Sequence, residues 1–486
     1  MVTRHFEALD ANARELFEIA MHWMEGCWDE GFGLLWARGD DASQFPPHHT
    51  TRESLWYAFG LLMRNRSGDL PRAIRVIETV LAYQLDAPDR VFHGTFLRAP
   101  EEPYPTAEAV IWRDYDPNWR EFIITALALI VLEYGDQLPA SLVARIEAAT
   151  RKAIVGARAR GLSASYTNIA LMFAFMACFA GKRFDEPSWF AEGEQMARDV
   201  YRLFKPHGAF AEYNSPTYYG VDLYALALWR CYPELSPLLA QLGREMEESL
   251  WRDVALFYHA DLRNLAGPYD RSYGMDMRRY VAVIGIWMRL VMDKRHAPFP
   301  DVDQPFGHEH DLGFIPLIVF LGAEIPSAAL EHFTAFRGER QIERVLTDTP
   351  SRVVTAWLGK DRMIGGEFTS LTPPRSTQLH AATLHWRLDP EQIGWVRVVY
   401  QAPVDARASQ NRLEVVTTGQ ITYLIHAPNV QPEQILRDHW RLPGLSVRVE
   451  TNAQSVKVQV ADGVVTAVYE VAPDHPIECT LICGSP

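Results

Sequence analysis

Apolar residues recur at three-and-four spacing from about residue 10 to residue 345, as they do along helices that bury one face. The breaks in this pattern carry Pro, Gly, Asp and Asn, which are typical of helix ends. The pattern predicts helices over Asn12–Trp36, Thr51–Met63, Leu70–Gln84, Trp119–Tyr134, Pro139–Ala159, Tyr166–Phe179, Pro187–Phe204, Tyr219–Tyr232, Pro237–His259, Met277–Met292 and Ile315–Leu321. Because these segments are alternately more and less apolar, we expect paired helices stacked in a ring, an (α/α) toroid whose loops line a cleft.

The period changes after about residue 350, where apolar and polar residues alternate or β-branched residues gather. This pattern predicts strands over Arg352–Leu358, Gly394–Tyr400, Leu413–Thr417, Gln420–His426, Leu445–Glu450, Ser455–Val460 and Val464–Glu470. Separated by turn residues, they favour an antiparallel β-sandwich. We therefore expect an α+β multidomain chain, with the toroid over residues 1–345, the sandwich over 346–486, and a linker near 340–351.

Composition narrows the choice of partner. A chain of 486 residues exceeds one ordinary core, and its 48% hydrophobic and 22% charged content is typical of a soluble globular protein. The net charge of −14 argues against nucleic acid or an anionic membrane as a general partner, so an acidic substrate needs a local cluster of Arg. The 14 Trp and 19 Tyr fit a cleft in which rings stack on sugar faces.

The sequence shows no signal for a disulfide framework, a zinc site, a common cofactor motif or a membrane segment. The five Cys are scattered and odd in number, and we interpret Cys479 and Cys483 as packing residues rather than zinc ligands. The chain lacks GxGxxG, P-loop, HExxH and GxSxG motifs, and we expect no cofactor. The N-terminus has no apolar signal segment and no apolar run is long enough to span a bilayer, so the expected location is the cytoplasm.

The segment Phe210–Tyr224 places a carboxylate, an amide and several tyrosines in a loop that runs into an apolar helix. A tyrosine hydroxyl exchanges protons, an amide stabilises an oxyanion, and aromatic rings stack on sugars. The alternative is a capped helix start, with Asn214 or Ser215 as N-cap and Pro216 in the first turn. The candidates for proton transfer and substrate binding are Glu212, Tyr213, Asn214, Tyr218 and Tyr219.

Two further loops carry groups that bind a carboxylate. Asn168 stands at the mouth of an apolar helix, where it can stabilise negative charge or serve as a helix cap. Arg271 is a natural carboxylate clamp because a guanidinium donates two parallel hydrogen bonds. Asp270 could orient Arg271, act as an acid, or form a structural pair that closes the loop, and Tyr273 adds an aromatic ring beside them.

Other polar segments predict substrate-binding edges. His49 and Arg52 precede an apolar helix and would suit a second sugar-binding edge, or loop surface. Asn118 and Trp119 end a segment rich in Trp and carboxylates, which is typical of a sugar subsite although Asp116-Pro is also a turn device.

The last candidates are histidines in the second half of the chain. His380 and His385 fall in the predicted β domain, and in a strand the odd step between them would point them to opposite faces, so one of them could face the cleft. His308 and His310, with Glu309 and Asp311, could bind a metal ion, but a single His-x-His is more typical of a charged loop. We expect no metal site.

A helical toroid followed by a β-sandwich, an Asn at an inner helix mouth and the run Glu-x-x-x-Pro-x-Tyr-Tyr at 212–219 resemble the heparinase II/III-like and alginate/chondroitin polysaccharide lyases. The resemblance implies β-elimination at a uronic acid: a neutraliser holds the carboxylate, a base removes the C5 proton and an acid protonates the leaving oxygen. It implies Asn168 as a neutraliser and Tyr218 or Tyr219 as base or acid. Arg271 joins them on chemical grounds rather than by a motif match.

The sequence departs from that group at Ile169, where such lyases often have a His next to the Asn. A His from elsewhere, such as His49, His380 or His385, must then serve, or the tyrosine does both jobs. The alternatives are a glycoside hydrolase on the same toroid, using two of the carboxylates Glu212, Asp270, Asp116 and Glu121, or a non-catalytic carbohydrate-binding protein. The expected partner is an acidic oligosaccharide or polysaccharide, and the oligomeric state stays open.

Overall fold

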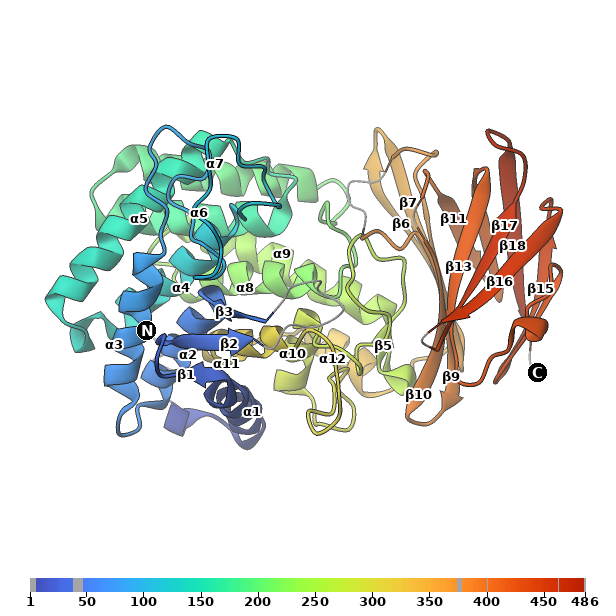
Figure 1. The fold of residues 1–486 in the computed structure, drawn as a ribbon, viewed down its shortest axis with the longest axis horizontal. Helices are drawn as coiled ribbons and strands as arrows, with labels where there is room; N and C mark the ends of the chain where they lie inside the picture. The colour runs from blue at the N-terminus through green and yellow to red at the C-terminus, as the bar shows by residue number, and fades with distance from the viewer. Residues whose placement is uncertain (1–5, 38–46, 374–377, 400, 462, 485–486) are drawn as a thin grey trace.

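The computed structural model describes residues 6–37, 47–373, 378–399, 401–461 and 463–484. It confirms the α+β class, with a helix-rich N-terminal part followed by antiparallel sheets (Figure 1). The α-helices are α1 (Ala11–Cys27), α2 (Arg52–Arg64), α3 (Asp69–Ala82), α4 (Trp119–Tyr134), α5 (Ala140–Arg160), α6 (Thr167–Arg183), α7 (Pro187–Phe204), α8 (Tyr218–Cys231), α9 (Pro237–Phe257), α10 (Val283–Val291), α11 (Ile315–Leu321) and α12 (Ser327–Thr334). Short 3-10 helices include η3 (Ala260–Leu262) and η4 (Glu309–Phe314).

The helices form the expected ring of pairs. Inner helices α2, α4, α6, α8 and α10 each contact the next, and α1 closes the ring between α10 and α2. Outer helices α3, α5, α7 and α9 each pack on the inner helix that precedes them. The inner helices α4 and α6 are buried almost throughout, which explains the more apolar segments of the sequence.

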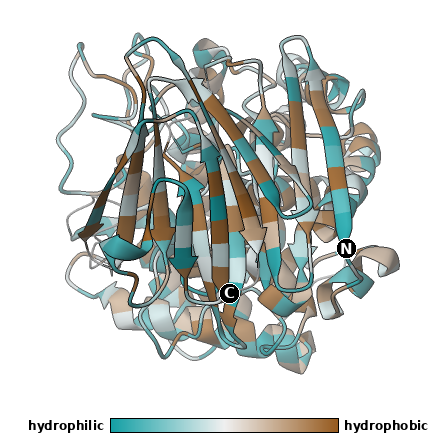
Figure 2. Cartoon of the chain, turned by 90° about the vertical axis from the view of Figure 1, so that its right-hand side faces the viewer, coloured by the Kyte–Doolittle hydropathy of each residue, from teal (hydrophilic) through white to brown (hydrophobic). Residues whose placement is uncertain are grey.

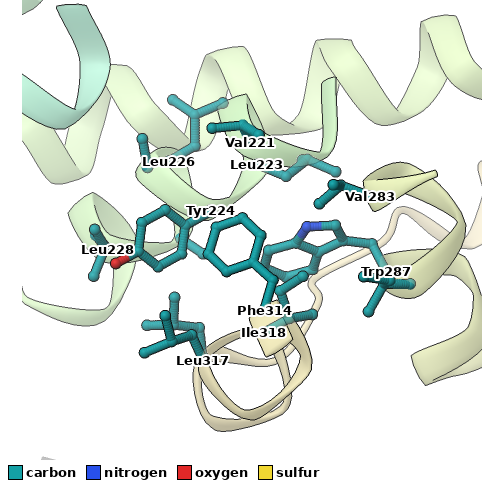
Figure 3. Packing of buried hydrophobic residues seen from close by; sticks show 14 of the residues in the cluster. Val221, Leu223, Tyr224, Leu226, Leu228, Val283, Trp287, Phe314, Leu317 and Ile318 are labelled. Atoms are coloured by element: carbon teal, nitrogen blue, oxygen red, sulfur yellow. The ribbon is translucent and has the colours of Figure 1, made fainter. Parts of the chain in front are cut away.

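Helix α11 lies inside the ring and contacts α1, α2, α8 and α10. Phe314, directly before α11, and Leu317 within it pack with Tyr224 of α8 and Trp287 of α10 (Figure 3). All seven residues of α11 are buried, so it fills the centre of the ring and leaves a cleft at one end.

Two predicted helices are longer than the observed ones. The segment predicted as helix to Trp36 ends at Cys27 and continues into β1 (Trp28–Asp29) and β2 (Leu34–Ala37), which pairs with β3 (His48–Thr50). A Gly33 with φ of 73° makes the turn that a continuing helix could not. Helix α10 begins at Val283, because the residues before it run extended and Val281 donates to the Gly307 carbonyl.

The C-terminal part contains an eight-stranded and a five-stranded antiparallel sheet. The first has the order β16-β17-β13-β10-β9-β8-β7-β6 and the second β11-β12-β18-β15-β14. Their bounds are β6 (Arg340–Asp348), β7 (Ser351–Leu358), β8 (Arg362–Phe368), β9 (Ala382–Asp389), β10 (Gln392–Val398), β11 (Asp405–Ser409), β12 (Arg412–Thr418), β13 (Gln420–His426), β14 (His439–Leu442), β15 (Leu445–Thr451), β16 (Ser455–Ala461), β17 (Val464–Glu470) and β18 (Pro476–Gly484). Tyr400, at the end of one predicted strand, lies outside the described residues.

The two sheets pack face to face, as the sequence predicts for a sandwich. Side chains from both sheets form one core, which includes the buried Cys479 and Cys483. Figure 2 looks onto this end of the molecule and shows hydrophobic and hydrophilic residues alternating along the strands. Val354, Ala356 and Leu358 of β7 belong instead to the helical core, so this part of the large sheet is buried on both faces.

The segment predicted as a linker, 340–351, forms β6 and the turn into β7. The expected boundary at residue 345 therefore lies inside a strand that pairs with β7. Within the described residues, none of the helices combines the length and the apolar character that crossing a membrane requires.

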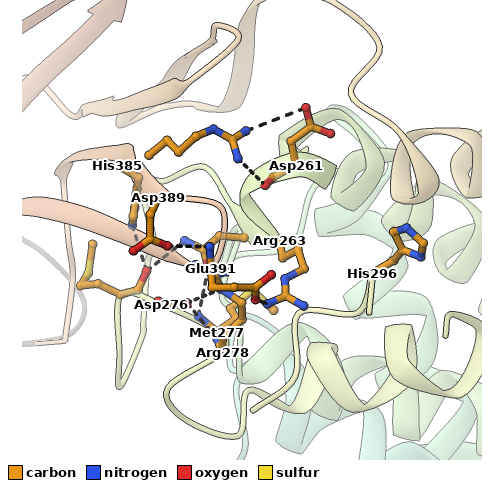
Figure 4. A network of polar contacts seen from close by, with 12 residues as sticks. Asp261, Arg263, Asp276, Met277, Arg278, His296, His385, Asp389 and Glu391 are labelled. Carbon is orange, nitrogen blue, oxygen red and sulfur yellow. Dashed lines mark hydrogen bonds and ion pairs between the residues drawn. The ribbon is translucent and has the colours of Figure 1, made fainter. Parts of the chain in front are cut away.

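Polar contacts tie the sandwich to the loop between α9 and α10. Arg263 donates to the Glu391 carboxylate over 2.7 Å, and Arg387 contacts Asp261 (Figure 4). His385 Nε2 lies 3.0 Å from the Met275 carbonyl oxygen. This loop carries Arg271 and Tyr273, so the sandwich fixes part of the cleft described next.

Candidate active site

The N-terminal ends of inner helices α2, α4, α6, α8 and α10, together with η4, meet around one cleft of about 400 Å³. Its wall is rich in aromatic rings and arginines, with two acids and several polar groups between them. The lining includes Arg52, Trp56, Arg98, Trp112, Asp116, Asn118, Trp119, Phe122, Tyr166, Asn168, Tyr218, Arg271, Tyr273, His308, His310, Asp311, Phe314 and Gln378. The structure thus brings together, at the helix mouths, much of the polar set that the sequence singles out.

The electrostatics of the cleft favour an anion. The N-terminal end of each inner helix carries partial positive charge, and several of these ends face the same space. Arg52, Arg98 and Arg271 add three guanidinium groups against the carboxylates of Asp116 and Asp311. This local balance contrasts with the net charge of −14 for the whole chain.

Asn168, Glu212 and Arg271 form the centre of the polar network. Asn168 Nδ2 donates to Glu212 Oε2 over 2.6 Å, and Arg271 Nη1 donates to Glu212 Oε1 over 2.8 Å. Arg271 Nε also donates to Gln378 Oε1 over 3.0 Å. Glu212 is 7% exposed and thus orients the amide and the guanidinium from behind.

Tyr218 lies against Arg271. Its hydroxyl accepts from Arg271 Nη2 over 2.5 Å and lies 2.6 Å from the Tyr273 hydroxyl. The Arg271 guanidinium also sits 3.7 Å from the centre of the Tyr218 ring. Burial, and next Tyr273, raise the pKa of Tyr218 well above its usual range, while Arg271 opposes that rise.

The two asparagines do not act as side-chain caps. Asn118 Nδ2 donates to the Tyr166 hydroxyl over 2.7 Å, and Arg160 donates to Asn118 Oδ1 over 2.9 Å. Asn168 is the second residue of α6, and its Oδ1 is buried with no hydrogen-bond partner among the described residues. Burial raises the pKa of Tyr166 to about 12. Both amides therefore belong to the cleft, as the functional interpretation of the sequence predicts.

Arg52 and Trp119 form an aromatic and cationic edge of the cleft. The guanidinium of Arg52 lies 4.3 Å from the Trp119 ring centre and 4.8 Å from that of Trp56. Arg52 also pairs with Glu53 in the same helix turn. An indole next to a cation suits a sugar ring that carries negative charge.

Tyr219, predicted as an alternative to Tyr218 for the base or acid, lies in the core and not in the cleft. It is 1% exposed and packs edge-on against Tyr213, with the ring centres 6.1 Å apart. Tyr213 in turn packs on Phe257 of α9. Neither tyrosine lines the cleft. One step along a helix turns a side chain by about 100°, so Tyr218 and Tyr219 cannot share a face.

Asn214 and Asp270 hold the loop that carries Arg271 rather than face the cleft. Asn214 has a φ of 49°, and its Nδ2 donates to the carbonyls of Ala266 and Pro268 over 2.8 Å each. Asp270 accepts from Arg352 of β7 over 3.1 Å and is 5% exposed. The interpretation of Asp270 as part of a structural pair is thus correct, although its partner is Arg352 and not Arg271.

The three histidines proposed to replace the missing one lie off the cleft. His49 Nδ1 lies 2.5 Å from a Glu101 carboxylate oxygen, and the His49 ring stacks on Phe32. His380 and His385 contact the carbonyls of Ser272 and Met275 from behind the loop. The expectation of opposite faces fails because His380 precedes β9, which begins at Ala382.

Of the four carboxylates considered for hydrolysis, Asp116 lines the cleft. Glu121 is fully buried in the first turn of α4, Asp270 pairs with Arg352, and Glu212 is occupied by Asn168 and Arg271. Burial raises the pKa of Asp116.

Three further residues line the cleft, one directly before η4 and two within it, and the sequence predicts no role for them. His308, His310 and Asp311 stand together in the cleft wall, where the sequence predicts a charged loop. The His308 ring stacks on Tyr273 with centres 4.3 Å apart. The available signal was the run His-Glu-His-Asp directly before an apolar helix, which is where the other cleft residues also stand. Arg98 and Gln378 carried no comparable signal.

Comparisons with known proteins identify a family without a known activity. Residues 14–323 match a family described as a domain of unknown function, DUF8769, and residues 338–475 match another, DUF8770. No curated protein matches the chain at a significant level.

Solved structures are similar at a distance. The crystal structure of heparinase III is 10% identical, with a TM-score of 0.46 over 98% of this chain and 85% of that one. Endoglucanase CelQ from Clostridium thermocellum, complexed with cellobiose and cellotriose, is 10% identical, with a TM-score of 0.26 over 98% and 93%. Likenesses this distant carry no information on activity, which must be argued from the cleft.

Proposed function

The chain belongs to the DUF8769 family, whose function is unknown, and we propose from its cleft that it is a carbohydrate-active enzyme that cleaves an acidic saccharide by β-elimination. The observation that carries the proposal is the contact of Arg271 with the Tyr218 hydroxyl, in a cleft lined by indole rings and helix N-termini. This places a group that can transfer a proton beside groups that bind a carboxylate.

The chemistry needs both kinds of group. The C5 proton of a uronic acid is weakly acidic because its removal adds charge to a carboxylate that is already negative. Donors fixed around that carboxylate stabilise the enolate-like transition state. Arg271, the amide of Asn168 and the surrounding helix ends are donors of this kind in the cleft.

Tyr218 can perform both proton transfers. As a phenolate, it accepts hydrogen bonds from Arg271 and from the Tyr273 hydroxyl. It removes the C5 proton, the C4–C5 double bond forms, and the bond from C4 to the leaving oxygen breaks. Tyr218 then gives the same proton to the leaving oxygen and returns to its starting state. A tyrosine with two roles explains why the cleft needs no histidine next to Asn168.

The test is an assay on uronate-containing oligosaccharides and on neutral oligosaccharides of the same length. We expect the ultraviolet absorbance of an unsaturated uronic acid to appear with the acidic substrates alone. Reducing ends that form without that absorbance would contradict elimination, and the absence of either product over a broad glycan panel would contradict catalysis.

A second candidate, glycoside hydrolysis, rests on Asp116. Its half-buried carboxyl lines the cleft, and its raised pKa is the property of a general acid. Asp311 also lines the cleft and offers a second carboxylate. In this case Asp116→Asn would abolish the release of reducing ends, and Tyr218→Phe would leave it unchanged.

A further inference from the structure

We infer that His308, His310 and Asp311 bind a divalent transition-metal ion, of which Zn²⁺ is the best match, in the wall of the cleft. The inference stands apart from the proposed β-elimination, because it rests on the ligand atoms and their surroundings and not on a substrate.

The geometry of the three side chains is close to that of a metal site. His308 Nδ1 and His310 Nε2 each lie 3.8 Å from an oxygen of Asp311, and one ligand atom from each residue falls within 4.8 Å of the others. Zn–N and Zn–O bonds of about 2.1 Å hold tetrahedral ligand atoms about 3.4 Å apart, so small side-chain rotations suffice. Two imidazoles and one carboxylate are the donor set of many open zinc and related sites.

The backbone holds these ligands in place. His308 has a φ of 56°, an unusual conformation for a residue other than glycine, and it directly precedes η4. Its ring is clamped by stacking on Tyr273, and its side chain is 8% exposed. A ligand held by a fixed backbone and a packed ring loses little freedom when it binds an ion.

The charge around the cluster also suits a cation. Arg52 and Glu53 pair with each other, and they interact electrostatically with Asp311 and His310 of the cluster, respectively. With neutral imidazoles this set has a net charge of −1, which a divalent ion would turn to +1. The ion would thus strengthen the positive potential that Arg52 and Arg271 give to the cleft.

An ion at this place would have a route in and open positions. His310 lines the cleft and also an adjoining hollow of about 940 Å³ on the side of α1, and its side chain is 30% exposed. Three protein ligands would leave at least one coordination position for water or a ligand oxygen.

The test is a calorimetric titration of the full chain, stripped with a chelator and dialysed, with Zn²⁺ and without saccharide. Three variants are compared with the wild type: His310→Gln and Asp311→Asn in the cluster, and His296→Gln as a control. His296 forms a similar i,i+3 pair with Asp293, 2.8 Å apart, on the surface and away from the cleft. Co²⁺ replaces Zn²⁺ in a parallel titration, because its visible absorption reports the coordination number.

We expect the wild type and His296→Gln to bind about one equivalent of Zn²⁺, and the two cluster variants to bind it at least about 100-fold more weakly. Zn²⁺ should also raise the Tm of the wild type and of the control but not of His310→Gln, whose partly exposed site tolerates the change. Substoichiometric binding by the wild type overturns the inference, and so does full binding by both cluster variants. Because no saccharide is present, either result leaves the proposed elimination to be judged by its own assay.

Discussion

Tyr218 and Tyr219 are neighbours in the chain with opposite surroundings, and they form a matched pair for mutation. Tyr218→Phe should lower kcat by about 100-fold or more, the range that proton-transfer groups contribute, while the fold stays intact. Tyr219→Phe should keep near-normal turnover, because its ring packs in the core against Tyr213. Turnover on uronate oligosaccharides measures both. Equal losses in the two variants would contradict the assignment of Tyr218.

The pH dependence of activity tests the same tyrosine. Burial raises the pKa of Tyr218 well above its usual range, so the phenolate is a minor form at neutral pH and grows tenfold with each pH unit. If the phenolate is the base, kcat/KM should rise with a slope of about one logarithmic unit per pH unit from pH 7 to 9. A profile that is flat over that range would show that another group removes the proton.

At the scale of single residues, the sequence predicts those cleft residues that stand at the N-terminal ends of apolar helices. Asn118, Asn168 and Tyr218 stand there, since inner helices of a ring present their ends to one space, whereas Arg271 was predicted from its chemistry as a carboxylate clamp. His380 and His385 were candidates for the cleft but hydrogen-bond to carbonyls behind a loop. The sequence does not reveal this, because a structural and a catalytic histidine are the same residue type. Such a case depends on how the helical part packs on the sheets, which no local pattern contains.

Helix α8 carries a buried acid one turn after Tyr218. Asp222 is fully buried, and neither of its carboxylate oxygens has a hydrogen-bond partner among the described residues. Burial raises its pKa well above the usual range, so the folded state keeps the carboxyl protonated. The unfolded chain releases that proton above about pH 4, so Asp222 costs stability as pH rises above that value.

Asp222→Asn should therefore raise the Tm at pH 8 by on the order of 2–4 °C, and by less as pH falls toward 4. Thermal unfolding at several pH values measures the difference. Asp199→Asn, on the surface of α7 beside Arg202, serves as a control and should show no such dependence. A pH-independent effect of Asp222→Asn would show that Asp222 is ionised in the folded protein.

Close packing of α8 on α10 shapes another part of the cleft. A Cβ on Gly220 would lie 2.4 Å from the Val283 carbonyl carbon and 2.5 Å from Ile284 N, both backbone atoms. Gly220→Ala should separate the helix ends that carry Val221 and Val283, lower stability by about 1–3 kcal/mol and raise KM. Gly135→Ala, where the nearest atom is 3.9 Å away, should change neither. Denaturant unfolding and steady-state kinetics check both variants.

Burial on one face or on both faces decides which strands the sequence predicts. β12 and β17 alternate buried and half-buried residues, so their period of two is visible. β8 is buried on both faces and contains Gly365, where a Cβ would lie 1.9 Å from the Gly267 carbonyl oxygen. Gly365 admits the loop of Arg271 and Gly366 admits β11 to the sheet surface, yet in a sequence Gly-Gly is typical of a turn.

Over the whole molecule, three buried histidines join the helical part to the sandwich. His259 contacts the Gly359 carbonyl over 2.8 Å, His380 that of Ser272 over 3.1 Å, and His385 that of Met275 over 3.0 Å. Each contact crosses from one part to the other. His380 Nδ1 accepts from Arg397, so its Nε2 must be the donor in a neutral ring. The position of the Arg271 loop thus depends on rings that carry no charge.

Acid should loosen this interface. Burial lowers the pKa of His259 to about 4, of His380 to about 3 and of His385 to about 4, so all three stay neutral in the folded state. The unfolded chain protonates them near pH 6.5, so their stabilising contribution is complete above that value and is lost as pH falls through 6.5 toward 4. Each histidine adds a slope of up to about 1.4 kcal/mol per pH unit to the free energy of unfolding.

Urea unfolding between pH 6 and 4.5 tests this argument. The free energy of unfolding should change less steeply with pH in His385→Gln than in the wild type, because glutamine keeps a donor but cannot titrate. His475→Gln, at an exposed position, should match the wild-type slope, and an identical slope in all three proteins would show that the interface does not respond to protons.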